Sequence, residues 1–288
     1  MTRRQITRPV QRTVKEARRV ITSPLGTDPD FVIIGAQKCG TTSLYRYLSM
    51  HPQVGAARTK EVHYYSMHFD RGRRWYRSNF PHALRRGIER RVRGRRFVSG
   101  EASPDYMFDA RAAERMRRDL PDVRLIALLR DPVTRALSHY RHTVRRGLEP
   151  LPFEEAIEAE GERLRNASPD SVPFRFQSYL ARGRYAEQLE RWFALFPREQ
   201  ILVLQAEDFF AETAAAYARV LSHIGVGPHD PGAFERHNFH GEYEGLSERA
   251  KRRLVDEFAP LNERLYSLIG ERFDWPGAAS PEAIVGEA

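Results

Sequence analysis

The chain has 288 residues, with 47 lysines and arginines against 38 aspartates and glutamates and a net charge of +9. A hydrophobic content of 41% is enough for one sizeable core and argues against a disordered chain. The single cysteine, Cys39, excludes an intrachain disulfide and a zinc site built from several thiolates. No apolar run approaches the roughly 20 residues of a membrane-spanning helix, and no apolar signal core follows the basic N-terminus. The sequence therefore predicts a cytoplasmic protein, and its basic surplus predicts an anionic partner.

Residues 1–27 form a basic leader with apolar residues at helical spacing, at positions 6, 10, 14, 17 and 21. A short amphipathic helix fits this spacing. The pattern favours a solvated or core-packed helix over a helix lying on an anionic membrane surface, although peripheral membrane contact through this leader stays open.

Residues 28–275 are predicted to form a single domain in which strands and helices alternate. Short apolar strands are expected at 31–35, 96–99, 123–129 and 201–205, and helices at 41–50, from about 109, from 132, and at 208–224. This order predicts an α/β fold with a central parallel sheet and helices on both faces, and ligands in such folds lie beyond the carboxyl ends of the strands. The polar residues 147–175 are predicted to be an excursion that covers a cleft, and residues 276–288 a disordered tail.

The first strand leads into a loop that has the spacing of a phosphate-binding loop. Gly35 and Gly40 permit tight turns, and the amides from Gly40 to Thr42 open a helix. Backbone amides at a helix N-terminus form an anion site. The loop therefore predicts a P-loop-type fold that binds phosphate.

Two departures from a nucleotide P-loop change the expected ligand. A nucleotide P-loop has its lysine after the second glycine, whereas Lys38 comes before Gly40. Arg130 follows the strand at 123–129, where an NTPase would offer an acidic magnesium ligand. A cation is wrong for a metal site but suits an additional phosphate. The sequence therefore predicts a phosphate-rich nucleotide bound without a metal.

Three motifs, in this order and spacing, resemble sulfotransferases that use 3′-phosphoadenosine 5′-phosphosulfate (PAPS). GAQKCGTTSLYRYLSMHP resembles their 5′-phosphosulfate loop, and LLRDPVTRALSHY resembles their 3′-phosphate motif. KEVHYY resembles the acceptor-side segment of the heparan sulfate sulfotransferase branch. LERWFALFPREQILVLQAEDFF and FAPLNERLYSLIGERFDW are similar to the C-terminal half of that branch. The similarity covers about residues 30–275.

The resemblance implies PAPS as the donor, PAP as the product and no metal. Lys38 would contact the 5′-phosphosulfate and neutralise the oxygen that the sulfuryl group leaves. The loop residues Cys39, Gly40, Thr41 and Thr42 would hold the same phosphate. Arg130 and Ser138 would bind the 3′-phosphate, whereas Arg135, in the same motif, and Arg141, directly after it, are expected at the surface.

On the acceptor side, Glu61 is the candidate general base, because an alcohol attacks efficiently only if its proton is accepted as the new bond forms. Glu61 and His63 are two positions apart, so in an extended segment their side chains point the same way. The resemblance implies that Glu61 is the base and that His63 assists, and the adjacent Lys60 is placed to hold Glu61 ionised or to reach the sulfate. The acceptor is expected to be a hydroxyl or an amine of a glycan or a small molecule, and the basic residues between 58 and 96 suit an anionic one.

Two segments depart from the heparan sulfate branch. In GEASPDY that branch usually has a lysine after the glutamate, and this chain has Ala102. The loop that closes over the donor is poorly matched in HNFHGEYEGLS, residues 237–247, so no donor contact is assigned after Asn238.

Two other functions compete with sulfuryl transfer. A P-loop kinase would need a lysine after Gly40 and an acidic magnesium ligand, and neither is in place. A nucleic-acid-binding protein is favoured by the pI near 9.9 and the arginine-rich stretch 85–96. No nucleic-acid-binding motif accompanies that stretch, so no nucleic acid is expected as a partner.

Overall fold

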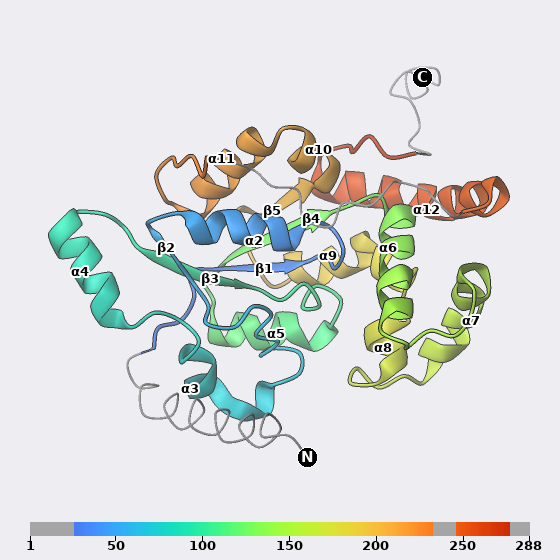
Figure 1. The fold of residues 1–288 in the computed structure, drawn as a ribbon, viewed down its shortest axis with the longest axis horizontal. Helices are drawn as coiled ribbons and strands as arrows, with labels where there is room; N and C mark the ends of the chain where they lie inside the picture. The colour runs from blue at the N-terminus through green and yellow to red at the C-terminus, as the bar shows by residue number, and fades with distance from the viewer. Residues whose placement is uncertain (1–25, 233–245, 277–288) are drawn as a thin grey trace, which may run out of the picture.

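The computed structural model describes residues 26–232 and 246–276. Its centre is a parallel sheet of five strands in the order β2-β3-β1-β4-β5 (Figure 1). The strands are β1 (Phe31–Gly35), β2 (Val54–Ala56), β3 (Val98–Ala102), β4 (Arg124–Leu129) and β5 (Ile201–Gln205).

Helices connect and cover these strands. The α-helices are α2 (Thr41–Met50), α3 (Gly72–Arg77), α4 (Ala83–Arg93), α5 (Ala110–Asp119), α6 (Pro132–Arg145), α7 (Phe153–Arg165), α8 (Val172–Phe176), α9 (Tyr185–Phe193), α10 (Ala206–Ala211), α11 (Thr213–Ile224) and α12 (Glu248–Ile269). Short 3₁₀ turns are η2 (Phe69–Arg71), η3 (Ala181–Gly183) and η4 (Arg198–Gln200).

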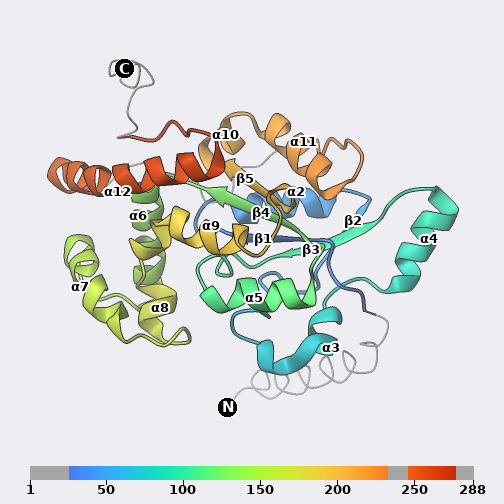
Figure 2. The ribbon, with the colours of Figure 1, turned by 180° about the vertical axis from the view of Figure 1, so that it is seen from behind.

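The sheet is covered on both faces. Helices α2 and α11 lie on one face, and α5 and α9 lie on the other (Figures 1 and 2). Every residue of β1 and β3 is buried, and in β4 only Arg124 is partly exposed. Burial on both faces explains the continuous apolar runs of β1 and β4. The predicted α/β fold class, a parallel sheet between helices, is confirmed.

The predicted elements differ from the observed ones at their ends and where an element is short. Strands 31–35 and 201–205 have the predicted bounds, whereas the predicted strand 96–99 lies at Val98–Ala102. The predicted helix 208–224 is interrupted at Glu212, where α10 ends and α11 begins. The three-residue edge strand β2 was not predicted.

Helix α7 lies inside the excursion predicted at residues 147–175, where no helix was expected. Its buried residues are Phe153, Ala156, Ile157 and Glu160, which share one helix face. One of the four buried positions is a glutamate, which weakens the apolar periodicity by which a helix is recognised in a sequence.

Side-chain caps set the start of two helices near the site. The Asp131 side chain accepts a hydrogen bond from the Thr134 amide at 2.9 Å, and Pro132 occupies the first turn of α6. Asp109 caps α5 by accepting from the Arg111 amide at 3.0 Å. An aspartate N-cap is a strong helix start, and proline in the first turn strengthens it in α6, which is why both starts were predictable.

Two separate hydrophobic clusters hold the described residues together. The larger one surrounds the sheet. The second one joins α6, α7 and α12 and contains Val133, Leu137, Phe153, Tyr179 and Phe258. Helix α7 is therefore supported by a core of its own, shared with α6 and α12.

The predictions for residues 1–25 of the leader, for the tail after residue 276 and for residues 233–245 of the closing loop lie outside the described residues. Within the described ranges, no helix combines the length and the apolar character needed to cross a bilayer.

Candidate active site

The loop between β1 and α2 places amides and a lysine at the carboxyl end of the sheet. Gly40 is the N-cap of α2, and no side chain caps this helix. The first amides of a helix have no acceptor within the helix, so those at Gly40, Thr41 and Thr42 can bind an anion. Thr41 and Thr42 both line a cavity of about 580 Å³.

Gly40 is required by its backbone and by its neighbours. Its φ of +89° lies in the left-handed region, which strains residues with a side chain. A Cβ at this position would approach a ring carbon of Phe210 to 2.7 Å. The loop therefore keeps its shape only with glycine here.

Lys38 lies in the cavity wall close to other cations. Burial lowers the pKa of Lys38, and Arg145 and Arg130 lower it further. The pKa of His142 is likewise lowered by burial and then by Lys38 and neighbouring arginines. An anion bound between these groups would relieve their repulsion. This end of the cavity is therefore suited to an anion.

Arg130 and Ser138 lie near this end at different depths. Ser138, in α6, lines the cavity. Arg130 is buried directly after β4, and its carbonyl accepts a hydrogen bond from the Tyr185 hydroxyl at 2.8 Å. The charge of Arg130 lowers the pKa of Lys38, although the Arg130 side chain is not part of the cavity lining. Cys39 is also buried behind the loop, with its pKa raised to about 11 chiefly by burial.

The expectation that Arg135 lies at the surface was wrong. Arg135 is fully buried and donates a hydrogen bond to the Tyr179 carbonyl. It faces inward because its helix, α6, is packed against α12, against η3 and against the buried residues of α7. His139 is one turn further along the same face and is also fully buried. Charged residues are seldom buried, so the sequence alone favoured the surface.

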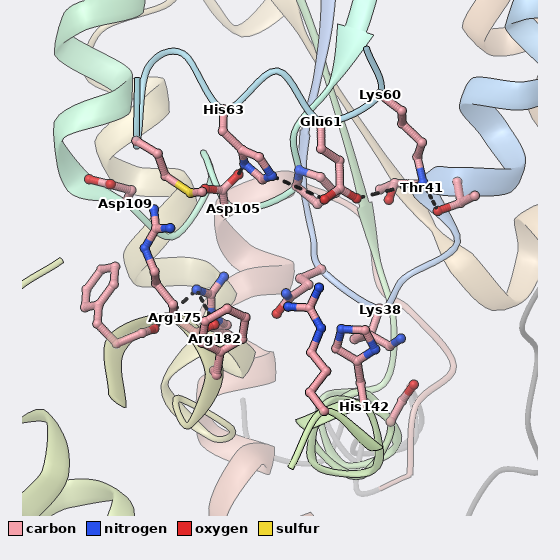
Figure 3. A pocket seen from close by; sticks show the side chains of 18 of the residues that line it. Lys38, Thr41, Lys60, Glu61, His63, Asp105, Asp109, His142, Arg175 and Arg182 are labelled. Atoms are coloured by element: carbon pink, nitrogen blue, oxygen red, sulfur yellow. Dashed lines mark hydrogen bonds and ion pairs between the residues drawn. The ribbon is translucent and has the colours of Figure 1, made fainter. Parts of the chain in front are cut away.

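Glu61 and His63 meet at the cavity wall, but the segment that carries them is not extended as predicted. Glu61 has a φ of +59° and His63 a φ of +53°. This left-handed turn brings Glu61 Oε2 to 3.3 Å from His63 Nε2. Lys60 Nζ lies 3.8 Å from Glu61 Oε1 and donates to Thr42 Oγ1 at 2.6 Å (Figure 3). Non-glycine residues in this backbone region often occur at functional sites.

Asp105 extends this contact and was not singled out from the sequence. Its Oδ1 lies 2.8 Å from His63 Nδ1, and its Oδ2 accepts from the Ser66 hydroxyl at 2.6 Å. Asp105 follows β3, whose carboxyl end faces the same edge as the phosphate loop. A carboxylate shortly after a predicted strand was the available signal.

Glu101 anchors the turn from beneath. It is fully buried and accepts hydrogen bonds from the Tyr76 hydroxyl at 2.8 Å and the Tyr106 hydroxyl at 3.0 Å. Its other oxygen accepts from the Ser103 hydroxyl at 2.7 Å and the Val62 amide at 3.3 Å. Glu101 therefore fixes the backbone between the two residues that meet in the cavity.

The charges of this wall follow from these contacts. Burial opposes protonation of His63, but Asp105 and Glu61 outweigh it and raise the His63 pKa to about 10. The hydrogen bond from His63 lowers the pKa of Glu61. At neutral pH the wall thus holds an imidazolium between two carboxylates. Because His63 already carries its proton, Glu61 is the member of the pair that can accept one.

The facing wall comes from the end of the excursion. Phe174, Arg175 and Phe176 of α8 line the cavity, and so does Arg182. Arg182 is buried with its guanidinium 4.5 Å from the centre of the Phe108 ring, and burial lowers its pKa to about 10. Figure 3 shows Glu61 and His63 along one side of the cavity, with Lys38 and the arginines opposite. The cavity is therefore suited to a ligand with more than one anionic group.

The sulfotransferase domain family matches residues 28–251. The chain belongs to this family. A solved sulfotransferase from Alicyclobacillus acidocaldarius is 32% identical, with a TM-score of 0.65, over 86% of this chain and 98% of that one. The predicted resemblance to sulfotransferases is confirmed, and the kinase-like and nucleic-acid-binding alternatives lose their support.

Curated relatives agree with the expected branch. The membrane-associated sulfotransferase kil1 of Dictyostelium discoideum is 26% identical over 86% of this sulfotransferase chain and 66% of its own length. The heparan sulfate glucosamine 3-O-sulfotransferase 3A1 of Mus musculus is 26% identical over 86% of this chain and 65% of its own length. The matches thus span slightly less than two thirds of these relatives.

Proposed function

We propose that this sulfotransferase moves a sulfuryl group from PAPS to a hydroxyl or an amine of a glycan-type acceptor, with Glu61 as the general base. The observation that carries the proposal is the ionised Glu61 on one cavity wall, opposite Lys38 on the phosphate loop. A base and a cation on opposite sides of one cavity are the groups that in-line transfer between two oxygens needs.

The chain's own groups fit a donor with phosphates at both ends. The uncapped N-terminus of α2 and the crowded cations around Lys38 suit the 5′ end. Arg130 and Ser138 would hold the 3′-phosphate, Ser138 from the cavity wall and Arg130 from behind it. PAPS supplies the sulfuryl group, and the bond that breaks leaves negative charge on its phosphate. Lys38 would stabilise that charge as a mobile point charge.

Glu61 would accept the proton of the attacking hydroxyl. His63 would stay protonated, hold the carboxylate in place through its Nε2 and be oriented in turn by Asp105. Lys60 would keep Thr42, on the donor side, close to Glu61, because it contacts both.

The relatives named for heparan sulfate support a glycan as the acceptor. The cavity adds a physical reason, because the cations Arg175, Arg182 and Arg145 suit the sulfates or carboxylates of an acidic polysaccharide. A small-molecule hydroxyl is the alternative, and Phe174, which lines the cavity and packs against Phe108 with ring centroids 4.7 Å apart, offers it an apolar surface.

The test is a transfer assay with radiolabelled PAPS and two sets of acceptors, desulfated or partly sulfated heparan-type polysaccharides and small phenols and alcohols. Label on the polysaccharide supports the proposal, and label on the small molecules alone favours the alternative. Lys38→Ala should abolish transfer in both sets. Phosphate transfer from ATP with magnesium, with no transfer from PAPS, would overturn the proposed chemistry.

A further inference from the structure

Helix α4 is oriented in the opposite way to an ordinary surface helix. None of its residues is buried, and Leu84, Ile88 and Val92 are 67%, 57% and 75% exposed. These residues are four positions apart, so they form one apolar stripe along the helix. A helix of a globular protein normally turns such a stripe towards the core.

The polar side of α4 is the side that contacts the rest of the protein. Arg86 lies roughly 160° around the helix from the centre of the stripe, at about 100° per residue. Its guanidinium donates to Asp30 at 2.6 Å and 3.1 Å, to the Asp28 carbonyl at 2.8 Å and to the Ser99 hydroxyl at 2.7 Å. These bonds hold the apolar stripe away from the body.

Arginines border the stripe on both sides. Arg85 and Arg91 lie roughly 60° to either side of its centre. Residues 83–96 contain seven arginines and one glutamate, and that glutamate, Glu89, is paired with Arg93 at 3.3 Å. Within the described residues, Arg90, Arg91 and Arg95 make no ion pair. The exposed surface of α4 therefore combines apolar side chains with unbalanced positive charge.

We propose that α4 docks this protein on an anionic lipid surface, with Leu84, Ile88 and Val92 entering the headgroup boundary and the arginines on either side binding lipid phosphates. An apolar stripe between cationic borders is the pattern of helices that lie in the plane of a membrane. Arginine stems can extend along the apolar surface while their charged ends reach the headgroups.

Three other ligands could cover the surface of α4: the leader, a second copy of the helix, or nucleic acid. None of them matches both its charge and its apolar stripe. The leader, residues 1–25, carries seven basic residues against Glu16 alone, so it would be repelled by α4. A second copy of α4 would meet the same repulsion. Nucleic acid would bind the arginines but leave the apolar stripe in water. An anionic bilayer matches both features.

The position of α4 agrees with this role. The helix directly precedes β3 and lies at the end of the molecule opposite α6, α7 and α8 (Figures 1 and 2). The active-site cavity is lined by α6 and α8 beyond the carboxyl ends of the strands. A bilayer against α4 would therefore leave the cavity accessible.

The test is flotation of the full-length protein with phosphatidylcholine vesicles that contain or lack phosphatidylglycerol. The protein should float only with the anionic vesicles. Each arginine near an anionic surface contributes about 1 kcal/mol, about fivefold in partitioning. Arg85→Gln, Arg91→Gln and Arg95→Gln together should therefore lower partitioning on the order of a hundredfold. The triple variant Leu84→Ser, Ile88→Ser, Val92→Ser should lower it at least tenfold.

Matched controls separate this surface from the leader and from loss of folding. Arg8→Gln, Arg12→Gln and Arg18→Gln remove the same charge from the leader and should change partitioning by less than about threefold. Both α4 variants should keep the PAP binding of the parent, and the serine variant should keep its melting temperature; Arg85 also contacts the Phe97 ring at 4.7 Å, so a small change is expected in the glutamine variant. The proposal is wrong if the parent protein ignores anionic vesicles, if the leader variant alone loses binding, or if the serine variant floats normally. A lower melting temperature or a loss of dimer in the serine variant would show that protein covers the stripe.

Discussion

Glu61, His63 and Asp105 form a continuous series of contacts in the cavity wall, and each member determines the charge of the next. The 2.8 Å contact with Asp105 keeps the proton on His63, and His63 in turn keeps Glu61 ionised. A carboxylate held ionised is ready to accept a proton, although its low pKa makes it a weaker base. Asp105 thus keeps His63 protonated, and His63 leaves Glu61 as the group that can accept a proton.

Replacement of Glu61 should separate chemistry from donor binding. Glu61→Gln keeps the size of the side chain but removes the basic lone pair, so kcat should fall by about 10²–10⁴-fold. The Kd for PAP should change by less than about threefold, or roughly 0.6 kcal/mol. Transfer kinetics and calorimetry with PAP measure the two effects. Glu158→Gln, on the exposed side of α7, is the matched control and should change neither. A Glu61→Gln enzyme that remains fully active towards an alkyl hydroxyl would refute the role.

Asp105 is predicted to act by positioning and charging His63. The folded-state pKa of His63, about 10, is above its ordinary value of 6.5. This contact therefore stabilises the protein fully below pH 6.5, and the stabilisation is lost as the pH rises through 10. In Asp105→Asn that loss, and the alkaline limb of kcat/KM, should move down by at least about one pH unit.

Melting temperatures and pH–rate profiles of the parent and of Asp105→Asn measure this shift. Asp28→Asn is the control, because Asp28 pairs with Arg73 at 2.9 Å and has no contact with His63. An unchanged alkaline limb in Asp105→Asn would mean that Asp105 only supports the backbone.

Among the elements, the loop from β1 to α2 was the easiest to predict. Its conformation requires a glycine at position 40. Gly40→Ala places a side chain at φ +89° and 2.7 Å from Phe210. The free energy of unfolding should fall by about 1–3 kcal/mol, and PAP binding should weaken because the amides move. Urea unfolding and calorimetry test both effects.

Gly87→Ala provides the opposite control for Gly40→Ala. Gly87 lies within α4, and a Cβ there would meet nothing within 4 Å. The free energy of unfolding should rise by about 0.5–1 kcal/mol, because alanine favours a helix over glycine. Equal effects of the two substitutions would mean that the loop conformation tolerates alanine.

The elements that were predicted best from the sequence are those that depend on a local residue pattern. Continuous apolar runs located β1 and β5, and aspartate caps located α5 and α6. The contacts of Asp105 with His63 and of Arg135 with Tyr179 join residues 42 and 44 positions apart. No local pattern contains such pairs, and the left-handed turn at Glu61 depends on the buried Glu101. The roles of the site residues remain predictions.

At the scale of the whole molecule, the cavity joins segments that are distant in the chain, from residues 37–42, 60–67, 104–109, 138–146 and 169–182. A ligand that bridges them should stabilise the entire domain. PAP at a hundred times its Kd should raise the free energy of unfolding by about 2.7 kcal/mol. For a domain of this size that is a rise in melting temperature of roughly 5–10 °C.

The rise should be the same in EDTA, because cations of the chain surround the predicted phosphate sites. It should shrink in Arg130→Ala, and ATP with magnesium should give a smaller rise than PAP. Differential scanning fluorimetry gives all three comparisons. A rise that requires magnesium would contradict the predicted metal-free donor site.

The two walls of the cavity differ in how they are joined to the hydrophobic core. The phosphate loop and the segment of Glu61 adjoin the main core, whereas no residue of α8 is buried or belongs to either hydrophobic cluster. Substitutions within α8 can therefore accumulate without disturbing the sheet. Descendants of this protein can therefore acquire new acceptors through substitutions in α8, while the residues of the phosphate loop and Glu61 are inherited unchanged.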